Sequence, residues 1–221
     1  MTAVKPIRIL LADDHQIVRQ GIRLLLSSDD RFTIIGETGD GLSTIVFARE
    51  HRPDVIVMDI TMPNLNGIDT TRRIMDEIAG IRIVALSMYF DKYFLAMMLR
   101  AGARGYLPKD CASAELARAI EVVCLDKYYI SPGLGIDSPK DVLSGSEIPN
   151  FIAMSLLTMK EREILQLIAE GYSSKEIAAR LNIHVKTVEK HRNNLIHKLG
   201  IPTVAELTKF AIREGLTSVD R

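Results

Sequence analysis

Val55-Ile56-Val57-Met58-Asp59 decides the fold, because a run of four apolar residues ends directly in a carboxylate. Two of the four are valines, so the run predicts a strand that is buried on both faces, as in a parallel sheet. The segment that follows, residues 61–67, is rich in turn formers and has no periodicity. Ligands bind open α/β sheets at the carboxyl ends of the strands, which makes Asp59 a candidate functional residue. A lone Asp at this position could equally cap a helix or close a turn.

The same pattern recurs along the first 125 residues. The apolar run 7–12 is followed by Asp13 and Asp14, the run 81–86 by Ser87, and the short segment that ends in Pro108 by Lys109. Segments with helical periodicity separate these runs. Five strand–helix units in about 120 residues predict a parallel sheet with helices on both faces.

The polar residues at the strand ends should converge, since the carboxyl ends of parallel strands lie together at one edge of the sheet. Three acids, one hydroxyl and one cation then share a small crevice. Close carboxylates repel one another, and a hard divalent cation such as Mg²⁺ relieves that repulsion. The alternative is a set of unrelated helix caps and surface charges, which requires the same coincidence at four strand ends.

Residues 154–221 show an almost entirely helical pattern. Thr158 and Glu161 form a capping-box signature at the start of the first helix. A second short helix and a tight turn lead to a longer third helix over residues 185–199, which is the helix-turn-helix plan. This segment carries 11 Lys+Arg against 8 Asp+Glu, an excess of +3 that weakly favours a polyanionic partner.

Composition limits the remaining possibilities. No apolar run approaches the ~20 residues of a membrane span, and the N-terminal residues lack a signal-peptide pattern. Cys111 and Cys124 fit neither a metal site nor a disulfide framework, so we expect a cytoplasmic protein with no membrane partner. Residues 126–153 are rich in turn formers and predict a linker between a domain of residues 1–125 and a domain of residues 154–221.

The first domain resembles the receiver domain of two-component response regulators. The motifs that carry the resemblance are Asp13-Asp14, Asp59 with Thr61-Met62-Pro63 and Gly67, and Ser87, Tyr106 and Lys109. The resemblance implies a flavodoxin-like fold with five parallel strands in the order 2-1-3-4-5. Pro108 fits that order, because the last strand would be an edge strand, where proline is tolerated.

The resemblance also implies a chemistry for these residues. Asp59 corresponds to the phosphoacceptor, which takes a phosphoryl group from a sensor histidine kinase. Mg²⁺ would be held by Asp13, Asp14, Asp59 and the backbone carbonyl of Thr61. The residues that sense the phosphoryl group and switch the receiver would be Ser87, Tyr106 and Lys109.

The second domain closely resembles the LuxR-type output domain. The segments that carry the resemblance are residues 157–163, 171–178, 187–191 and 198–200. The whole chain therefore resembles the NarL/FixJ class: a transcription regulator that is switched by phosphorylation, binds double-stranded DNA and dimerises when phosphorylated. The residues expected to contact DNA are Lys186, Thr187, Glu189, Lys190, Asn193 and His197. Taken alone, this helix face could equally be a solvated surface.

Two other functions remain open. A regulator that binds DNA independently of phosphate would share the output domain, but the complete set of acids argues against it. A phosphohydrolase with an Asp nucleophile could also use acids at strand ends and Mg²⁺. Haloacid-dehalogenase-type phosphohydrolases need a second Asp two residues after the nucleophile, where this chain has Thr61. We therefore do not expect an enzyme.

Overall fold

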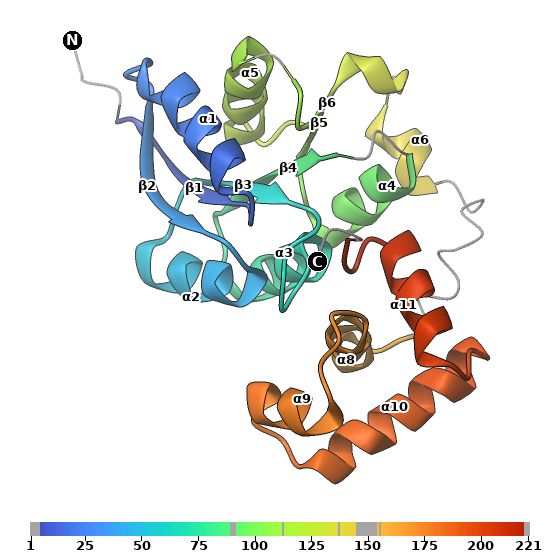
Figure 1. The fold of residues 1–221 in the computed structure, drawn as a ribbon. Helices are drawn as coiled ribbons and strands as arrows, with labels where there is room; N and C mark the ends of the chain where they lie inside the picture. Colours follow the sequence, from blue (N-terminus) through green and yellow to red (C-terminus); the bar gives the residue numbers. More distant parts are fainter. Residues whose placement is uncertain are drawn as a thin grey trace. The chain divides into compact units, whose positions relative to one another are not determined.

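The computed structural model describes residues 5–88, 92–111, 113–136, 138–144, 154 and 156–218. These residues form two compact units, one built mainly from residues before 145 and the other mainly from residues after 153. Figure 1 colours the chain along its length and labels the helices and strands of both units.

A parallel sheet forms the centre of the first unit. Its strands are β1 (Ile7–Ala12), β2 (Phe32–Thr38), β3 (Val55–Asp59), β4 (Arg82–Ser87), β5 (Gly105–Pro108) and β6 (Tyr129–Ile130), in the order β2-β1-β3-β4-β5-β6. Every residue of β3 is buried, as its unbroken apolar run predicts. The predicted parallel sheet with alternating helices is confirmed.

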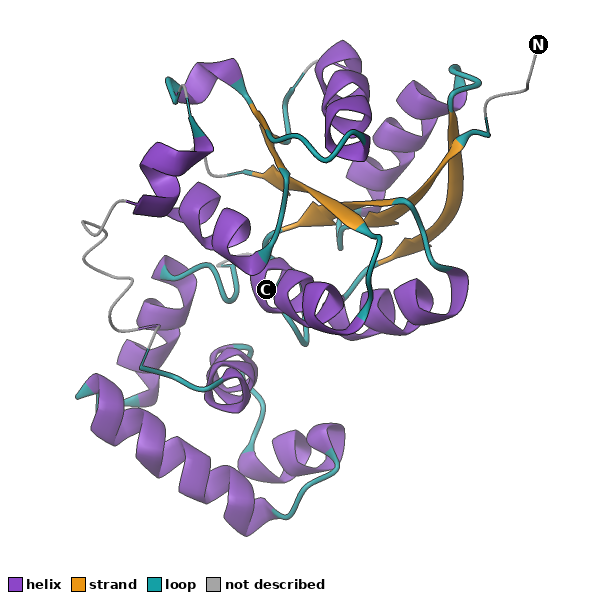
Figure 2. Ribbon diagram, turned by 180° about the vertical axis from the view of Figure 1, so that it is seen from behind, coloured by secondary structure: helices purple, strands orange, loops and turns teal. Residues whose placement is uncertain are grey.

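Helices cover both faces of the sheet (Figure 2). They are α1 (Gln16–Ser27), α2 (Gly41–His51), α3 (Gly67–Glu77), α4 (Lys92–Ala101) and α5 (Ser113–Cys124). Ile22 and Leu26 of α1 share a buried cluster with Leu116 and Ile120 of α5 and with side chains of the strands. Burial of such side chains contributes about 1.5–3 kcal/mol each, which fixes these helices against the sheet.

The sheet has six strands where the sequence predicts five. Tyr129 and Ile130 pair with Gly105 and Tyr106 of β5, so β5 is not an edge strand and that expectation was wrong. Pro108 is still tolerated, because β6 ends before it reaches that level of β5.

Further regular structure lies within the range predicted as a linker. The 3₁₀ turn η1 (Pro132–Leu134) and the helix α6 (Pro139–Ser144) follow β6, and α6 packs against α4. The middle of the predicted linker, residues 145–153, lies outside the described residues. The exact domain limits, 1–125 and 154–221, stay a prediction.

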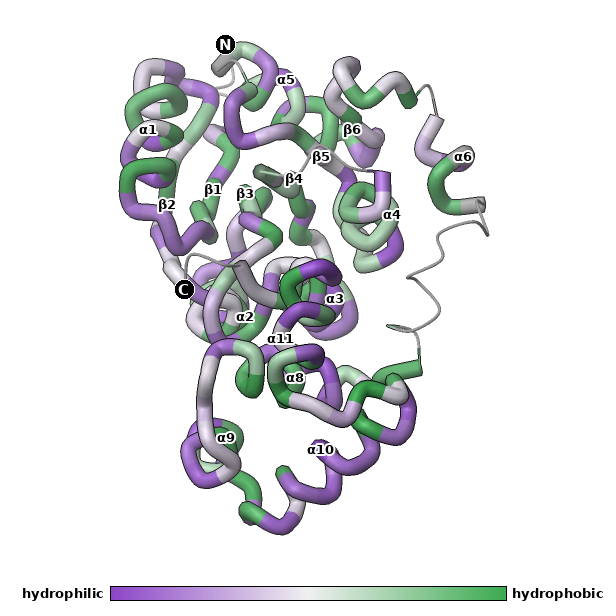
Figure 3. Tube along the Cα trace, turned by 45° about the vertical axis from the view of Figure 1, so that its right-hand side comes forward, coloured by the Kyte–Doolittle hydropathy of each residue, from purple (hydrophilic) through white to green (hydrophobic). Residues whose placement is uncertain are grey.

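The second unit contains α8 (Met159–Ala169), α9 (Ser174–Leu181), α10 (Val185–Leu199) and α11 (Val204–Arg213). The predicted capping box is present: Thr158 accepts from the Glu161 backbone N–H, and Glu161 accepts from the Thr158 backbone. Ile164, Val188, Leu195 and Leu207 belong to its buried core. Figure 3 shows that hydrophilic residues predominate along α10, as expected for a helix with one buried stripe.

None of the helices in the part of the chain that the structure describes is both long and apolar enough to cross a bilayer.

Candidate functional site

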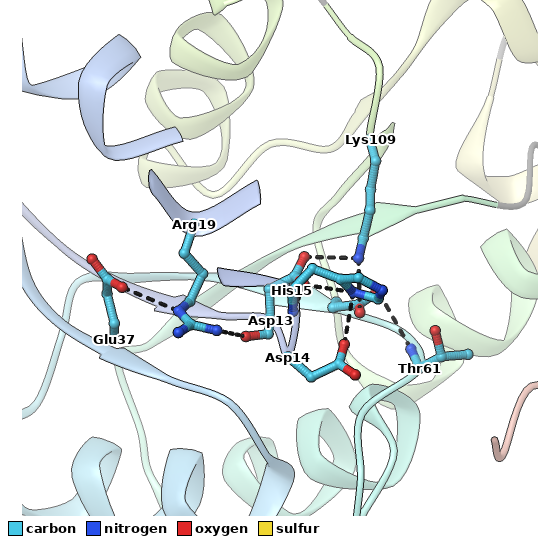
Figure 4. Close-up of polar contacts among 8 residues, drawn as sticks. Asp13, Asp14, His15, Arg19, Glu37, Thr61 and Lys109 are labelled. Atoms are coloured by element: carbon cyan, nitrogen blue, oxygen red, sulfur yellow. Dashed lines mark hydrogen bonds and ion pairs between the residues drawn. The ribbon is translucent and has the colours of Figure 1, made fainter. Parts of the chain in front are cut away.

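The acids that follow β1 and β3 meet at the carboxyl edge of the sheet. Because Ala12 pairs with Met58 in the register of β1 and β3, Asp13 and Asp59 emerge side by side. The side chains of both residues are almost fully buried, whereas that of Asp14 is 21% exposed. One oxygen from each acid and one nitrogen of His15 all lie within 4.8 Å of one another. We call these four residues the acid cluster, of which Figure 4 labels Asp13, Asp14 and His15.

Lys109 directly follows β5 and reaches the acid cluster along the carboxyl edge of the sheet. Its Nζ lies 2.7 Å from Asp13 Oδ2 and 2.8 Å from Asp59 Oδ2, and its side chain is buried. The Lys109 backbone N–H donates to the carbonyl of Ser87 at 2.9 Å, which fixes the start of the loop after β5. Burial alone would lower the pKa of Lys109, but the charges of Asp59 and Asp13 outweigh burial and raise it.

The carboxyl group of Asp59 holds its proton more tightly than an ordinary aspartate does. Burial is the largest cause, the charge of Asp13 adds to it, and Lys109 opposes both, so that the pKa of Asp59 rises to about 7. One ammonium faces three carboxylates, which leaves an excess of negative charge in a buried site. Oxygen donors with excess negative charge are what a hard divalent cation requires, so these residues fit Mg²⁺.

The structure brings the other predicted receiver residues together only in part. Ser87 is buried at the end of β4 and lines a cavity of about 420 Å³ together with Lys109. The backbone N–H of Thr61 lies 3.4 Å from Asp59 Oδ1, at the start of the loop after β3. Tyr106 is fully buried in β5 and is not among the residues that line the cavity.

Three residues at this edge have no role in the sequence-based prediction. His15 places its ring over Asp13 and Asp14. Arg19 donates from Nη1 to the carbonyl of Asp13 at 2.5 Å and from Nε to Glu37 Oε2 at 3.1 Å. Arg19 and Glu37 thus hold the acidic loop against β2 (Figure 4). The adjacency of His15 to Asp13-Asp14 is the one signal in the sequence that could have indicated its role.

The second unit presents a polar surface along α10. Val188 and Leu195 are buried, and the six residues predicted to contact DNA are all exposed: Lys186, Thr187, Glu189, Lys190, Asn193 and His197. Four of them, Lys186, Lys190, Asn193 and His197, recur at helical spacing and form one stripe. The tight turn before α10 ends at the N-cap His184, and Gly200 caps the helix in the left-handed conformation.

Comparisons with known proteins agree with both halves of this description. Residues 9–121 match the response regulator receiver domain, and residues 155–211 match the bacterial regulatory proteins of the luxR family. The chain is 37% identical over 218 residues to the transcriptional regulatory protein MctR of Rhizobium johnstonii, covering 99% of both chains. It is 33% identical over 213 residues to the oxygen regulatory protein NreC of Staphylococcus carnosus, covering 95% of this chain and 98% of NreC.

A solved structure extends these likenesses to the fold. RcsB from Salmonella enterica serovar Typhimurium, bound to the promoter P1flhDC in the presence of a phosphomimetic, is similar with a TM-score of 0.61. The identity is 25%, and the match covers 93% of this chain and 98% of RcsB. The chain thus belongs to the NarL/FixJ-type response regulators, two-component transcription regulators in which a receiver domain is joined to a LuxR-type DNA-binding domain.

Proposed function

We propose that Asp59 accepts a phosphoryl group from a sensor histidine kinase and that this modification controls DNA binding by the C-terminal domain. The observation that carries the proposal is the position of Asp59: buried at the end of the central strand, beside Asp13 and in contact with Lys109. A carboxylate oxygen of Asp59 forms the new P–O bond while the P–N bond of the donor phosphohistidine breaks. The leaving imidazole takes up a proton.

Asp13, Asp14, Asp59 and the backbone carbonyl of Thr61 would hold Mg²⁺. A bound Mg²⁺ supplies positive charge that stabilises the phosphoryl oxygens during transfer. Lys109 already lies within contact of Asp59 Oδ2 and supplies a second positive charge at that position. The burial of these residues strengthens each of these electrostatic interactions, because the surroundings are less polar than water.

Ser87 and Tyr106 would carry the signal away from the phosphoryl group. Ser87 lines the same cavity as Lys109, so its hydroxyl can donate to a phosphoryl oxygen there. Lys109 is tied to Ser87 through the backbone, and Ser87 pairs with Pro108, two residues after Tyr106. A shift of Ser87 is thereby coupled to β5 and to the rotamer of Tyr106, which gives the receiver two alternative surfaces.

The exposed stripe of α10 is the proposed DNA-reading surface. In the helix-turn-helix plan the second helix enters the major groove, and α10 follows α9 after a tight turn. Lys186 and Lys190 can contact phosphates or guanine edges, Asn193 can contact adenine, and Glu189 can accept from cytosine. We infer a homodimer in the phosphorylated state, since two copies can read two half-sites, and a cytoplasmic location, where kinase and DNA are both accessible.

The experiment that tests the phosphoacceptor uses a small acyl-phosphate donor with Mg²⁺ and the full-length protein. The wild type should gain an acid-stable, base-labile phosphoryl label, and Asp59→Asn should gain none, because an amide is not a nucleophile for this reaction. The control variant Asp29→Asn changes a partly exposed acid outside the acid cluster and should be labelled as the wild type is. Undiminished labelling of Asp59→Asn would overturn the assignment.

A further inference from the structure

His15 occupies the N-cap position of α1, but its side chain does not cap the helix. An N-cap side chain ordinarily accepts a backbone N–H from the first turn. The imidazole Nδ1 of His15 instead lies 2.9 Å from Asp14 Oδ1 and 3.2 Å from Asp13 Oδ1. The backbone N–H of His15 donates to the same Asp13 oxygen at 2.8 Å. Backbone and side chain together hold the ring against the carboxylates (Figure 4).

The distances in the acid cluster suit joint coordination by one ion. Two ligands at right angles around an octahedral ion, each at about 2.1 Å, lie about 3 Å apart. The 2.9 Å between His15 Nδ1 and Asp14 Oδ1 is a hydrogen-bond length that also matches this spacing. An ion that displaced the proton from Nδ1 into solvent would therefore find both atoms at coordinating distance. The side chain of His15 is 56% exposed, so the ring has room to adjust toward an ion without disturbing the core.

The chemistry of the donors indicates which ions would use the nitrogen. Mg²⁺ prefers oxygen ligands and keeps several waters, so it gains little from an imidazole. Imidazole nitrogen suits the divalent ions of the first transition row, and affinity for a given mixed site rises from Mn²⁺ toward Cu²⁺. A nitrogen among three carboxylates therefore widens the range of ions that the acid cluster can bind.

We propose that His15 is a direct ligand, through Nδ1, to a divalent transition-metal ion such as Mn²⁺ in the acid cluster. The inference rests on the proposed function, in which the same acids would hold Mg²⁺. It adds a nitrogen ligand to a set of oxygen ligands that would already accept either Mg²⁺ or Mn²⁺. His15 then raises the affinity of the site for Mn²⁺ relative to Mg²⁺.

Pulsed electron paramagnetic resonance of the full-length protein loaded with Mn²⁺ tests the coordination directly. We expect modulation from a ¹⁴N nucleus bound to Mn²⁺ in the wild type and its loss in His15→Gln, which keeps a polar side chain but offers no imidazole. The matched control is His51→Gln. His51 is an exposed histidine that stacks on Phe47 of α2, and the control should retain the modulation. Absence of the signal in the wild type, or its survival in His15→Gln, would overturn the proposal.

Isothermal titration calorimetry with Mn²⁺ and with Mg²⁺ provides a second readout. The ratio of the two affinities should fall about tenfold in His15→Gln, the size of effect that loss of an ordering or ligating group has on metal binding. It should not change in His51→Gln. An unchanged ratio in His15→Gln would mean that His15 only hydrogen-bonds to the carboxylates, and the proposal would fail.

Phosphorylation of the wild type with Mg²⁺ separates this inference from the proposed function. Uptake of the phosphoryl group without ¹⁴N modulation would reject the His15 ligand and leave the phosphoacceptor in place. Modulation without any uptake would support the His15 ligand and reject the phosphoacceptor.

Discussion

Asp59 is the residue at which stability and function oppose each other most clearly. Its pKa is raised to about 7 from an ordinary value of 3.8, first by burial and then by the charge of Asp13. Between these two pH values the folded protein holds a proton that the unfolded chain has lost. The contribution of Asp59 is therefore most favourable below pH 4 and is lost as the pH rises to about 7.

We expect Asp59→Asn to raise the free energy of unfolding at pH 8 in the absence of divalent cations. Each pKa unit corresponds to about 1.4 kcal/mol, so the gain has an upper limit of about 4 kcal/mol. The gain should shrink toward pH 4, where Asp59 of the wild type is protonated in both states. Urea unfolding measures this gain in the free energy of unfolding. Far-ultraviolet circular dichroism is the suitable probe, because the chain has no tryptophan for fluorescence. Added Mg²⁺ should stabilise the wild type more than the variant.

Asp29→Asn is the control with the opposite sign. The side-chain hydrogen bond from Arg31 lowers the pKa of Asp29 to about 2, so removal of its charge should bring no stabilisation at pH 8. A difference between Asp59→Asn and the wild type that is the same at pH 5 and pH 8 would contradict the assignment of the buried charge to Asp59.

The three acids of the acid cluster could be predicted from the sequence because they stand at the ends of apolar strands. Strand topology then brings Asp13, Asp59 and Lys109 together, and the structure places Lys109 Nζ 2.7 Å from Asp13 and 2.8 Å from Asp59. The direction of the His15 ring could not be predicted, because it depends on a side-chain rotamer and not on periodicity. The hydrogen bond from Arg19 to the carbonyl of Asp13 could not be predicted either, because it joins a side chain to a backbone atom.

At the scale of elements, the approach of α3 to the end of β3 depends on Gly67. A Cβ atom on Gly67 would lie 1.9 Å from the carbonyl oxygen of Asp59 and 3.1 Å from the Cα of Ile60. Both obstacles are backbone atoms, so they cannot move aside as a flexible side chain can. Gly67→Ala should therefore destabilise the protein by about 1–3 kcal/mol or more and slow phosphorylation, because the loop after Asp59 must shift.

Gly21→Ala is the matched control for this prediction. Gly21 lies within α1, and a Cβ there would meet no atom within 4 Å. Alanine favours a helix interior over glycine by about 0.5–1 kcal/mol, so this variant should be stabilised. Thermal unfolding and labelling by the phosphodonor measure both variants. If both variants changed stability and labelling to the same extent, the close approach of the backbone would not explain why position 67 requires glycine.

The helix α10 allows a second prediction at this scale. Lys190→Ala should weaken binding to an operator selected from a random DNA pool. If Lys190 contacts a base edge, the loss is about 1–3 kcal/mol and the base preference changes. If it contacts phosphate, all sequences weaken alike and the salt slope falls by about one. The control is Lys209→Ala, which removes an exposed lysine of α11. An unchanged DNA affinity of Lys190→Ala would mean that Lys190 is not part of the DNA-binding surface.

Elements with a strong local signal were predictable, and those without one were not. The capping box of Thr158 and Glu161 marks the start of α8 in the sequence, and the structure contains it. A second capping box, of Ser173 and Glu176, begins α9 in the same way. The strand β6 has only two residues, which are too few to show any periodicity. It forms because its residues pair with the backbone of β5.

At the scale of the whole molecule, we expect a single output domain to bind DNA weakly. The charge excess of +3 over residues 154–221 supports only a few phosphate contacts, and phosphate contacts dominate non-specific affinity. Two modules that are joined through their receivers act at an effective concentration in the millimolar range at best. Their half-sites would lie about one helical turn of DNA apart. We therefore propose dimerisation as the step through which the receiver controls DNA binding.

We therefore expect phosphorylation to convert the full-length protein from monomer to dimer and to increase its affinity for a two-half-site operator. Sedimentation velocity with and without the phosphodonor measures the first effect, and DNA titration of the same samples measures the second. Asp59→Asn is the control and should show neither. A phosphorylated protein that stays monomeric both free and on DNA would contradict the dimer. A dimer with no gain in operator affinity would instead show that pairing of the receivers does not control the output domain, because the second module then contributes no binding energy.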